Sequence, residues 1–167
     1  MFTYQIRKFG IDNLELGGLP KPVPEAGEVL VRLHAASLNF RDVMVVNGTY
    51  NPRMRLPAIP LSDAAGKVVQ VGPGVTKWKF NDQVCSTLIP GWISGGPTAA
   101  SSKTAIGAGG MTGVACDFAL FREDAIVAAP EHLSMDEAAT LPCAALTAWH
   151  ALSVSGHLQP GETVLTL

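Results

Sequence analysis

Three cysteines and an isolated histidine are the first residues that could do chemistry. Cys85, Cys116 and Cys143 are odd in number and far apart, which argues against a disulfide framework and fits a reducing compartment. We interpret them as buried structural thiols. His34 stands on the polar face of a predicted strand, where a surface histidine is a simpler interpretation than a metal ligand.

Asn39 and Asp42 have the spacing of a helix start. Asn39 can be the N-cap, and Asp42, three residues further on, can reach back to it. Gly48 is a natural stop, so the sequence predicts a short helix between these positions. Asp42 is interpreted as a capping partner rather than an acid. Tyr50 lies in the irregular loop that follows.

The elements that must position these residues are mostly strands. The 17 glycines and 12 prolines among 167 residues demand many turns and limit long helices to a few windows. Residues 28–36 form the clearest strand, because apolar side chains alternate along it. Further strands are predicted over residues 64–71, 83–89, 114–121 and 125–128, with a long loop over 91–113 between the second and the third.

The last part of the chain is predicted to be helical. Ser134 and Glu137 match an S-x-x-E capping box, and Pro142 is expected to separate a short helix from a longer one over Cys143–Ser155. Residues 163–167 are predicted to begin an apolar strand of a parallel sheet. The longer helix carries an apolar stripe that we expect to lie in a core, formed by Ala145, Leu146, Trp149 and Leu152.

Composition excludes several classes of protein. Hydrophobic residues make up 47% of the chain and charged residues 16%, with 12 Lys and Arg against 14 Asp and Glu, which is typical of a globular protein. No basic block could follow a phosphate backbone, so no nucleic acid is expected as a partner. Apolar runs are too short to cross a membrane, and the first residues lack the pattern of a signal peptide. We therefore expect a soluble, cytoplasmic protein.

Three segments carry a family resemblance. Leu38–Asp42, Gly72–Val84 and Leu141–Trp149 resemble the medium-chain dehydrogenase/reductase superfamily, whose pattern runs over essentially the whole chain. The resemblance implies a mainly β fold with short helices, in which a GroES-like, partly open β-barrel is followed by helices and the first strand of a Rossmann domain. It implies that residues 1–128 form a GroES-like catalytic domain, which binds the substrate. Residues 129–167 would form a helical linker and the first strand of a truncated NAD(P)-binding Rossmann domain.

The dinucleotide site of this family is expected beyond the sequence. The glycine-rich turn that holds the pyrophosphate would follow Leu167. We therefore expect a truncated piece of a longer protein, inactive by itself, whose full-length form uses NADP(H) or NAD(H). The resemblance also implies a small-molecule substrate, and it allows a homo-oligomer of the full-length protein.

The zinc-binding positions of the family carry unsuitable residues. The resemblance aligns the first catalytic cysteine with Asn39 and a Gly-His-Glu segment with Leu61–Asp63. Asn39 and Ser62 are not workable zinc ligands, and Asp63 alone cannot hold the metal. The four cysteines of the structural zinc lobe would fall in residues 91–113, which contain none. We predict that the protein uses no zinc.

The zinc-free members of the family supply the functional hypothesis. They are quinone oxidoreductases and enoyl thioester reductases, so the resemblance implies hydride transfer from NAD(P)H to a quinone, enone or enoyl thioester. Tyr50 is the candidate proton donor or carbonyl hydrogen-bond donor, because a phenol can donate at neutral pH. A loop tyrosine that covers the barrel mouth is the alternative. Asn39 would orient the nicotinamide or the substrate, Thr147 would lie near the nicotinamide, and Trp92 would line the substrate pocket or anchor its loop.

Two other functions stay open at this point. One is an alcohol or aldehyde dehydrogenase-type oxidoreductase, which would need another acid or base in place of zinc. The other is a standalone GroES-like binding module without catalysis, with the loop over residues 91–113 as its contact element.

Overall fold

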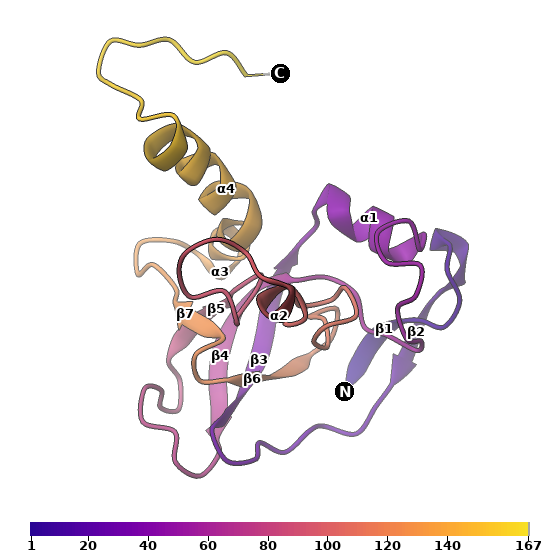
Figure 1. Cartoon of the computed structure of the whole chain (residues 1–167). Helices are drawn as coiled ribbons and strands as arrows, with labels where there is room; N and C mark the ends of the chain where they lie inside the picture. Colours follow the sequence, from indigo (N-terminus) through magenta and orange to yellow (C-terminus); the bar gives the residue numbers. More distant parts are fainter. Residues whose placement is uncertain (167) are drawn as a thin grey trace.

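The computed structural model describes residues 1–166, and two antiparallel sheets form most of it (Figure 1). Strands β1 (Phe2–Ile6) and β2 (Leu14–Gly18) pair around a short 3₁₀ turn, η1 (Ile11–Asn13). The larger sheet has the strand order β6-β3-β4-β5-β7. Its strands are β3 (Glu28–Ser37), β4 (Asp63–Val71), β5 (Gln83–Ser86), β6 (Phe118–Arg122) and β7 (Ile126–Ala128). The expected mainly β fold with short helices is confirmed.

The main core lies on one face of the larger sheet, and a smaller cluster with Ala65, Cys85 and Ala138 covers part of the other face. In β3, Val29 and Val31 belong to the main core. Leu30 is buried as well, and only further along the strand are Arg32 and His34 exposed. His34 is therefore a surface histidine, as predicted. The core cluster gathers side chains from every strand of this sheet and from the following loops, among them Val29, Val31, Val68, Val84, Ile106, Phe121 and Ile126.

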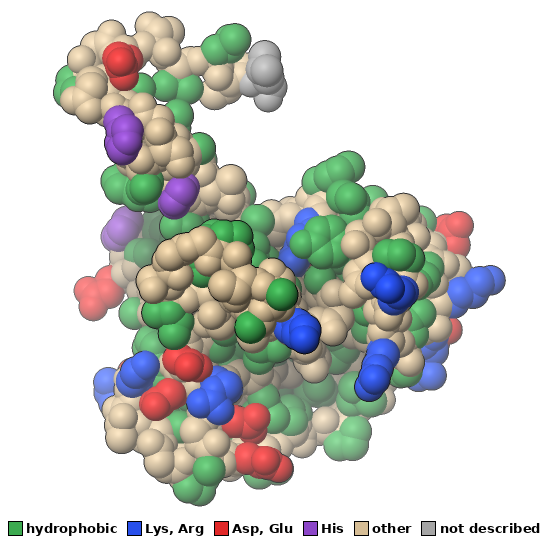
Figure 2. Space-filling model, viewed as in Figure 1, with side chains coloured by type: hydrophobic (Ala, Val, Ile, Leu, Met, Phe, Trp, Pro, Cys, Tyr) green, Lys and Arg blue, Asp and Glu red, His purple; other side chains and the backbone are tan. Residues whose placement is uncertain are grey.

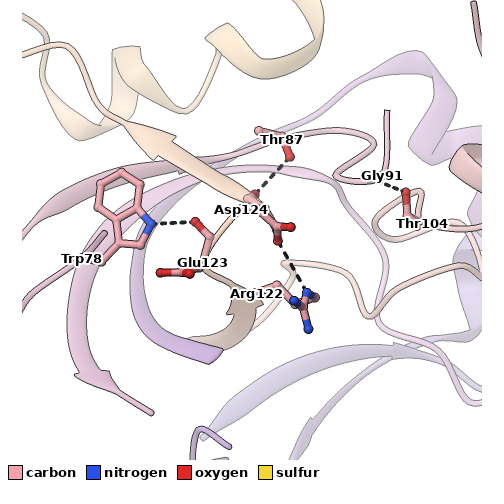
Figure 3. A network of polar contacts seen from close by, with 8 residues as sticks. Trp78, Thr87, Gly91, Thr104, Arg122, Glu123 and Asp124 are labelled. Carbon is pink, nitrogen blue, oxygen red and sulfur yellow. Dashed lines mark hydrogen bonds and ion pairs between the residues drawn. The ribbon is translucent and has the colours of Figure 1, made fainter. Parts of the chain in front are cut away.

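The turn between β4 and β5 is fixed to the turn between β6 and β7 by one residue (Figure 3). The Trp78 indole N–H donates to the Glu123 carbonyl oxygen at 2.8 Å. The Glu123 carboxylate accepts the backbone N–H groups of Thr76 and Lys77, and these hydrogen bonds lower the pKa of Glu123. Asn81 adopts φ 73° in the same turn, a left-handed conformation that asparagine tolerates better than most residues.

The predicted long loop between β5 and β6 contains a short helix that the sequence reading missed. Helix α2 (Ala99–Ser102) is capped by Thr98, whose hydroxyl accepts the Ser101 N–H at 3.0 Å. The loop closes on itself where the Gly91 N–H donates to the Thr104 hydroxyl at 2.8 Å (Figure 3). After Thr104 the chain returns to the core at Ile106.

Both predicted capping boxes are present. Helix α1 (Phe40–Val46) begins after Asn39, and the Asp42 carboxylate accepts the Asn39 N–H at 2.8 Å. Helix α3 (Met135–Ala138) begins after Ser134, whose hydroxyl and backbone N–H both donate to the Glu137 carboxylate. A longer helical run follows it, formed by the π-helical η2 (Leu141–Ala145), α4 (Leu146–Trp149) and the π-helical η3 (His150–Ser155).

The apolar stripe of that helical run was expected in a core, and this prediction is wrong. Leu146 is 60% exposed and Trp149 is 65% exposed, and Ala145 and Leu152 are exposed as well. The run extends away from the sheets, so that only its first turn lies near the body of the chain (Figure 1). Periodicity identifies a helix face that is suited to burial, but it does not specify what covers that face.

The strand predicted over residues 163–167 is not formed in its described part. Residues 163–166 pair with no strand, because an isolated strand has no neighbour for its backbone groups. Leu167 lies outside the described residues. The division of the chain at residue 128 stays a prediction. Within residues 1–166, no helix is long and apolar enough to cross a bilayer.

The core predicts a sharp difference between two isoleucines that follow β5. Ile106 is 0% exposed and Ile93 is 85% exposed. Ile106→Ala should lower the free energy of unfolding by about 2–5 kcal/mol, because it leaves a cavity in the core. Ile93→Ala should change it by less than about 0.5 kcal/mol. Urea denaturation followed by tryptophan fluorescence measures both, and equal losses would contradict the core described here.

Candidate functional site

The first turn of α1 holds one side of the candidate site. Asp42 is buried there, and its loss of hydration raises the pKa of Asp42, while the hydrogen bond from the Asn39 N–H acts against this shift. The Asn39 side chain is half-buried, and its Nδ2 atom is buried with no hydrogen-bond partner among residues 1–166. A buried donor without a partner costs free energy, which a ligand oxygen can recover.

Arg41 connects α1 with Tyr50. Its guanidinium carbon lies 5.6 Å from the centroid of the Tyr50 ring, within the range of a cation–π contact. One Nη atom donates to the Ile106 carbonyl oxygen at 3.0 Å, which fixes the guanidinium against the long loop. The phenol itself remains accessible, since Tyr50 is 47% exposed. The structure therefore places Tyr50 beside the helix that Asn39 caps.

Asp63, at the start of β4, holds the opposite side of the site. The Ser62 hydroxyl donates to Asp63 Oδ1 at 2.6 Å, and the Cys143 backbone N–H donates to Asp63 Oδ2 at 2.8 Å. Both Ser62 and Asp63 are completely buried. The carboxyl group thus joins the first turn of η2 to the sheet, across 80 residues of sequence.

Cys143 brings the two sides together. Burial raises the pKa of its thiol, and the nearby Asp63 carboxyl raises it further, while the Arg41 guanidinium and a hydrogen bond with Thr147 act in the opposite direction. Thr147 thus lies beside the Cys143 thiol, and the charge of Arg41 acts on that thiol. Arg41 in turn contacts Tyr50 and belongs to the helix that Asn39 caps.

The interpretation of the cysteines as buried structural thiols needs a correction. Only Cys85 is buried, whereas Cys116 and Cys143 are half-buried, and all three are free thiols. The sequence reading missed Cys143 as a neighbour of the site because its contact is made by a backbone N–H. Such a contact has no signature in residue type.

Trp92 is not linked to the other predicted site residues by any hydrogen bond in the described part of the chain. Its indole N–H donates to the Gly95 carbonyl oxygen at 2.8 Å, within the same loop. Trp92 is partly exposed. These contacts are those of a residue that anchors its own loop, and its role in a substrate pocket stays a prediction.

The chain is similar to known proteins of one family. The alcohol dehydrogenase GroES-like domain family matches residues 25–131, and the chain belongs to this family. A zinc-type alcohol dehydrogenase-like protein of Schizosaccharomyces pombe is 41% identical over 143 residues, which are 84% of this chain and 41% of that protein. A chloroplast envelope quinone oxidoreductase homologue of Arabidopsis thaliana is 35% identical over 146 residues, 86% of this chain and 39% of that protein.

A solved structure shows the same fold. A cobalt- and zinc-bound thermostable alcohol dehydrogenase from Pyrobaculum aerophilum superposes with a TM-score of 0.81 at 31% identity, covering 97% of this chain and 50% of that one. The chain thus spans about half the length of this structure, and less of the two relatives above. The predicted superfamily is confirmed, and its matched members include alcohol dehydrogenases and quinone oxidoreductase homologues.

The two half-buried thiols should respond separately to their neighbouring acids. Asp63 contributes to the raised pKa of Cys143, and Asp117 contributes to the pKa of Cys116, which burial raises to about 11. Asp63→Asn should therefore lower the pH at which Cys143 is alkylated by iodoacetamide. Asp117→Asn should do so for Cys116 alone. Peptide mass spectrometry of pH-dependent alkylation measures both, and a common shift of both thiols would contradict this assignment.

Proposed function

We propose that the full-length protein containing this chain is a zinc-independent, NAD(P)H-dependent reductase of an alkene conjugated to a carbonyl group, as in a quinone, enone or enoyl thioester. The observation that supports this proposal best is the Asn39 amide N–H, which has no hydrogen-bond partner among residues 1–166 and belongs to the same helix start as the Arg41–Tyr50 pair. Asn39 as a whole is half-buried, so rotation of its side chain would let the amide meet a ligand oxygen.

The protein must position the hydride donor, stabilise the negative charge on the carbonyl oxygen and protonate the α-carbon. When bound, NAD(P)H supplies a hydride, which carries two electrons to the β-carbon of the substrate. The C=C π electrons then move toward the carbonyl oxygen, where the Asn39 amide would donate a hydrogen bond to the developing negative charge. Tyr50 would give its proton to the α-carbon, directly or through water, and would recover a proton from solvent through its exposed edge. Thr147 would lie beside the nicotinamide ring.

The residues at the family's zinc positions do not fit zinc. Asn39 offers an amide and Ser62 a hydroxyl, and neither is a ligand that zinc takes in proteins. Ser62 donates its hydroxyl proton to Asp63, and the other oxygen of Asp63 accepts the Cys143 N–H. The donor set is therefore engaged in hydrogen bonds that hold the fold together.

An alcohol or aldehyde dehydrogenase-type reaction is the second candidate function. It is favoured by relatives that include an alcohol dehydrogenase of Geobacillus stearothermophilus, which is 33% identical over 162 residues. Removal of a proton from an alcohol needs a base, and Asp42 and Asp63 are both buried and bonded to backbone N–H groups. A binding module without catalysis remains a third hypothesis.

The assignment of Tyr50 predicts a kinetic difference between the two tyrosines of the chain. Tyr50 and Tyr4 are equally accessible, at 47% and 46% exposure. Tyr50→Phe in the full-length protein should lower kcat for an enone by roughly 100-fold, because the proton donor is lost. Tyr4→Phe should leave kcat within about twofold. Stopped-flow oxidation of NAD(P)H measures both, and equal effects would refute the role of Tyr50.

The role of Asn39 predicts a second loss. Asn39→Ala should lower kcat/KM by roughly 100-fold, the usual effect of removing one donor to a developing oxyanion. Asn39→Asp keeps the N-cap oxygen but removes the amide N–H. It should lose a similar part of its activity, and its melting temperature should fall somewhat, because it places a second carboxyl group beside the buried Asp42; activity is therefore compared at a temperature at which circular dichroism shows both proteins folded. An active Asn39→Asp variant would show that Asn39 only caps the helix.

The mismatch with zinc predicts insensitivity to metal removal. Incubation of the full-length protein with a chelator, followed by gel filtration, should leave reduction of an enone unchanged, since the proposed step uses hydrogen-bond donors alone. The same treatment of a zinc-dependent alcohol dehydrogenase is the positive control. Loss of activity that returns on adding zinc would favour the dehydrogenase-type reaction.

A further inference from the structure

Two loops meet beside the candidate site and hold each other in place. Met54 is buried in an apolar cluster with Ala108, and the Asn51 side-chain amide donates to the Ala108 carbonyl oxygen at 3.3 Å. A Cβ on Gly109 would lie 2.8 Å from Met54 Cγ, so the Met54 side chain packs closely against the Gly109 backbone. The loop over residues 51–55 is therefore seated on the second loop by a buried anchor.

This anchor directs two arginines to the surface. Arg53 and Arg55 flank Met54 in the sequence, and both are exposed while Met54 is buried. Lys103 lies on the other loop, where its carbonyl oxygen leaves no room for a Cβ on Gly110, and the Lys103 side chain is exposed too. We call Arg53, Arg55 and Lys103 the cationic rim.

The cationic rim adjoins the proposed catalytic residues. Arg41 donates to the Ile106 carbonyl oxygen, in the same loop as Lys103, and stacks on Tyr50. Tyr50 directly precedes the loop that carries Arg53 and Arg55. The segments that carry the rim are therefore joined directly to those that carry Tyr50 and that hold Arg41.

The rim is a local excess of positive charge on a weakly acidic chain. The net charge of the chain is -2, and the ion pairs between side chains of residues 1–166 involve other cations, namely Arg7, Lys79 and Arg122. Asp42 and Asp63, the carboxyl groups of the site, are buried and hydrogen-bonded within the fold. Figure 2 shows Lys and Arg side chains near the centre of this face with no Asp or Glu beside them, whereas both signs of charge are mixed at its lower left and at its right edge.

We propose that the cationic rim binds the phosphate groups of the substrate, which is then an enoyl thioester of a phosphate-bearing thiol rather than a free quinone. This inference rests on the proposed function, because it places the conjugated carbonyl at Tyr50. Arginine matches the geometry of phosphate with paired N–H donors, and lysine adds a point charge. Exposed side chains of α1, such as Phe40 and Val43, supply an apolar neighbourhood for the acyl part.

Phosphate at the rim could have two sources, the thiol carrier of the substrate or the nicotinamide cofactor, and paired substrates separate them. Crotonyl-coenzyme A and crotonyl-N-acetylcysteamine present the same reacting group, and only the first carries phosphate. The full-length protein should prefer the coenzyme A thioester by roughly tenfold in kcat/KM. This preference should shrink as salt increases, because the rim is exposed.

The double variant Arg53→Gln/Arg55→Gln should lower this preference to near unity. The control variant Lys77→Gln/Lys79→Gln also removes two positive charges, but from the turn between β4 and β5. It should retain the tenfold preference. An unchanged preference in the rim variant would overturn the proposal. A rise in KM for NADPH with both thioesters, at constant preference, would assign the rim to the cofactor and also overturn it.

Calorimetric titration with coenzyme A itself keeps this test independent of catalysis. The full-length protein should bind coenzyme A, and the rim variant should bind it roughly tenfold more weakly than the control variant. Binding through the rim without reduction of either thioester would reject the proposed function and support the rim. Reduction of crotonyl-N-acetylcysteamine without any binding of coenzyme A would support the function and reject the rim.

Discussion

The buried carboxyl group of Asp63 is the constraint on which the candidate site depends. A carboxyl group removed from water must find hydrogen bonds within the protein, and Asp63 finds them in the Ser62 hydroxyl and the Cys143 backbone N–H. The hydrogen bond from Cys143 ties the helical run to the start of β4. The end of β3, which leads into α1, pairs with β4 at the same point. The residues proposed to handle hydride, carbonyl and proton come from segments far apart in the chain. Asp63 positions the segment that carries Thr147, while Asn39 and Tyr50 are positioned by α1 and by Arg41.

The parts of this structure that the sequence predicts are those whose causes are local. The helix starts at Asn39 and Ser134 are determined by side chains three residues away, so a reader of the sequence can see both partners at once. The exposure of His34 on the polar side of β3 was likewise predicted from the residue types along the strand itself. Short-range signals of this kind were enough for the fold class and for both capped helices.

The parts that the sequence does not predict depend on distant partners. The contact between Asp63 and Cys143 is invisible, since a backbone N–H is present at almost every position. The apolar stripe around Trp149 was expected to be buried, but a periodic pattern only describes one side of an interface. Within the site, Tyr50 and Asn39 could be named from residue type and resemblance. Arg41, which links Tyr50 to the long loop, could not, because its partners are a ring and a carbonyl oxygen from other elements.

The closure between Gly91 and Thr104 has a consequence for the evolution and engineering of this domain. One hydrogen bond pins the two ends of the loop together at its base (Figure 3), and Ile106 then returns the chain to the core. The segment between these ends is mostly exposed, so its length and composition can vary at little cost to the sheet. Homologous domains could exchange this segment as a cassette, and a tag or a foreign peptide inserted after Gly96 would be displayed on the surface without a new core having to form.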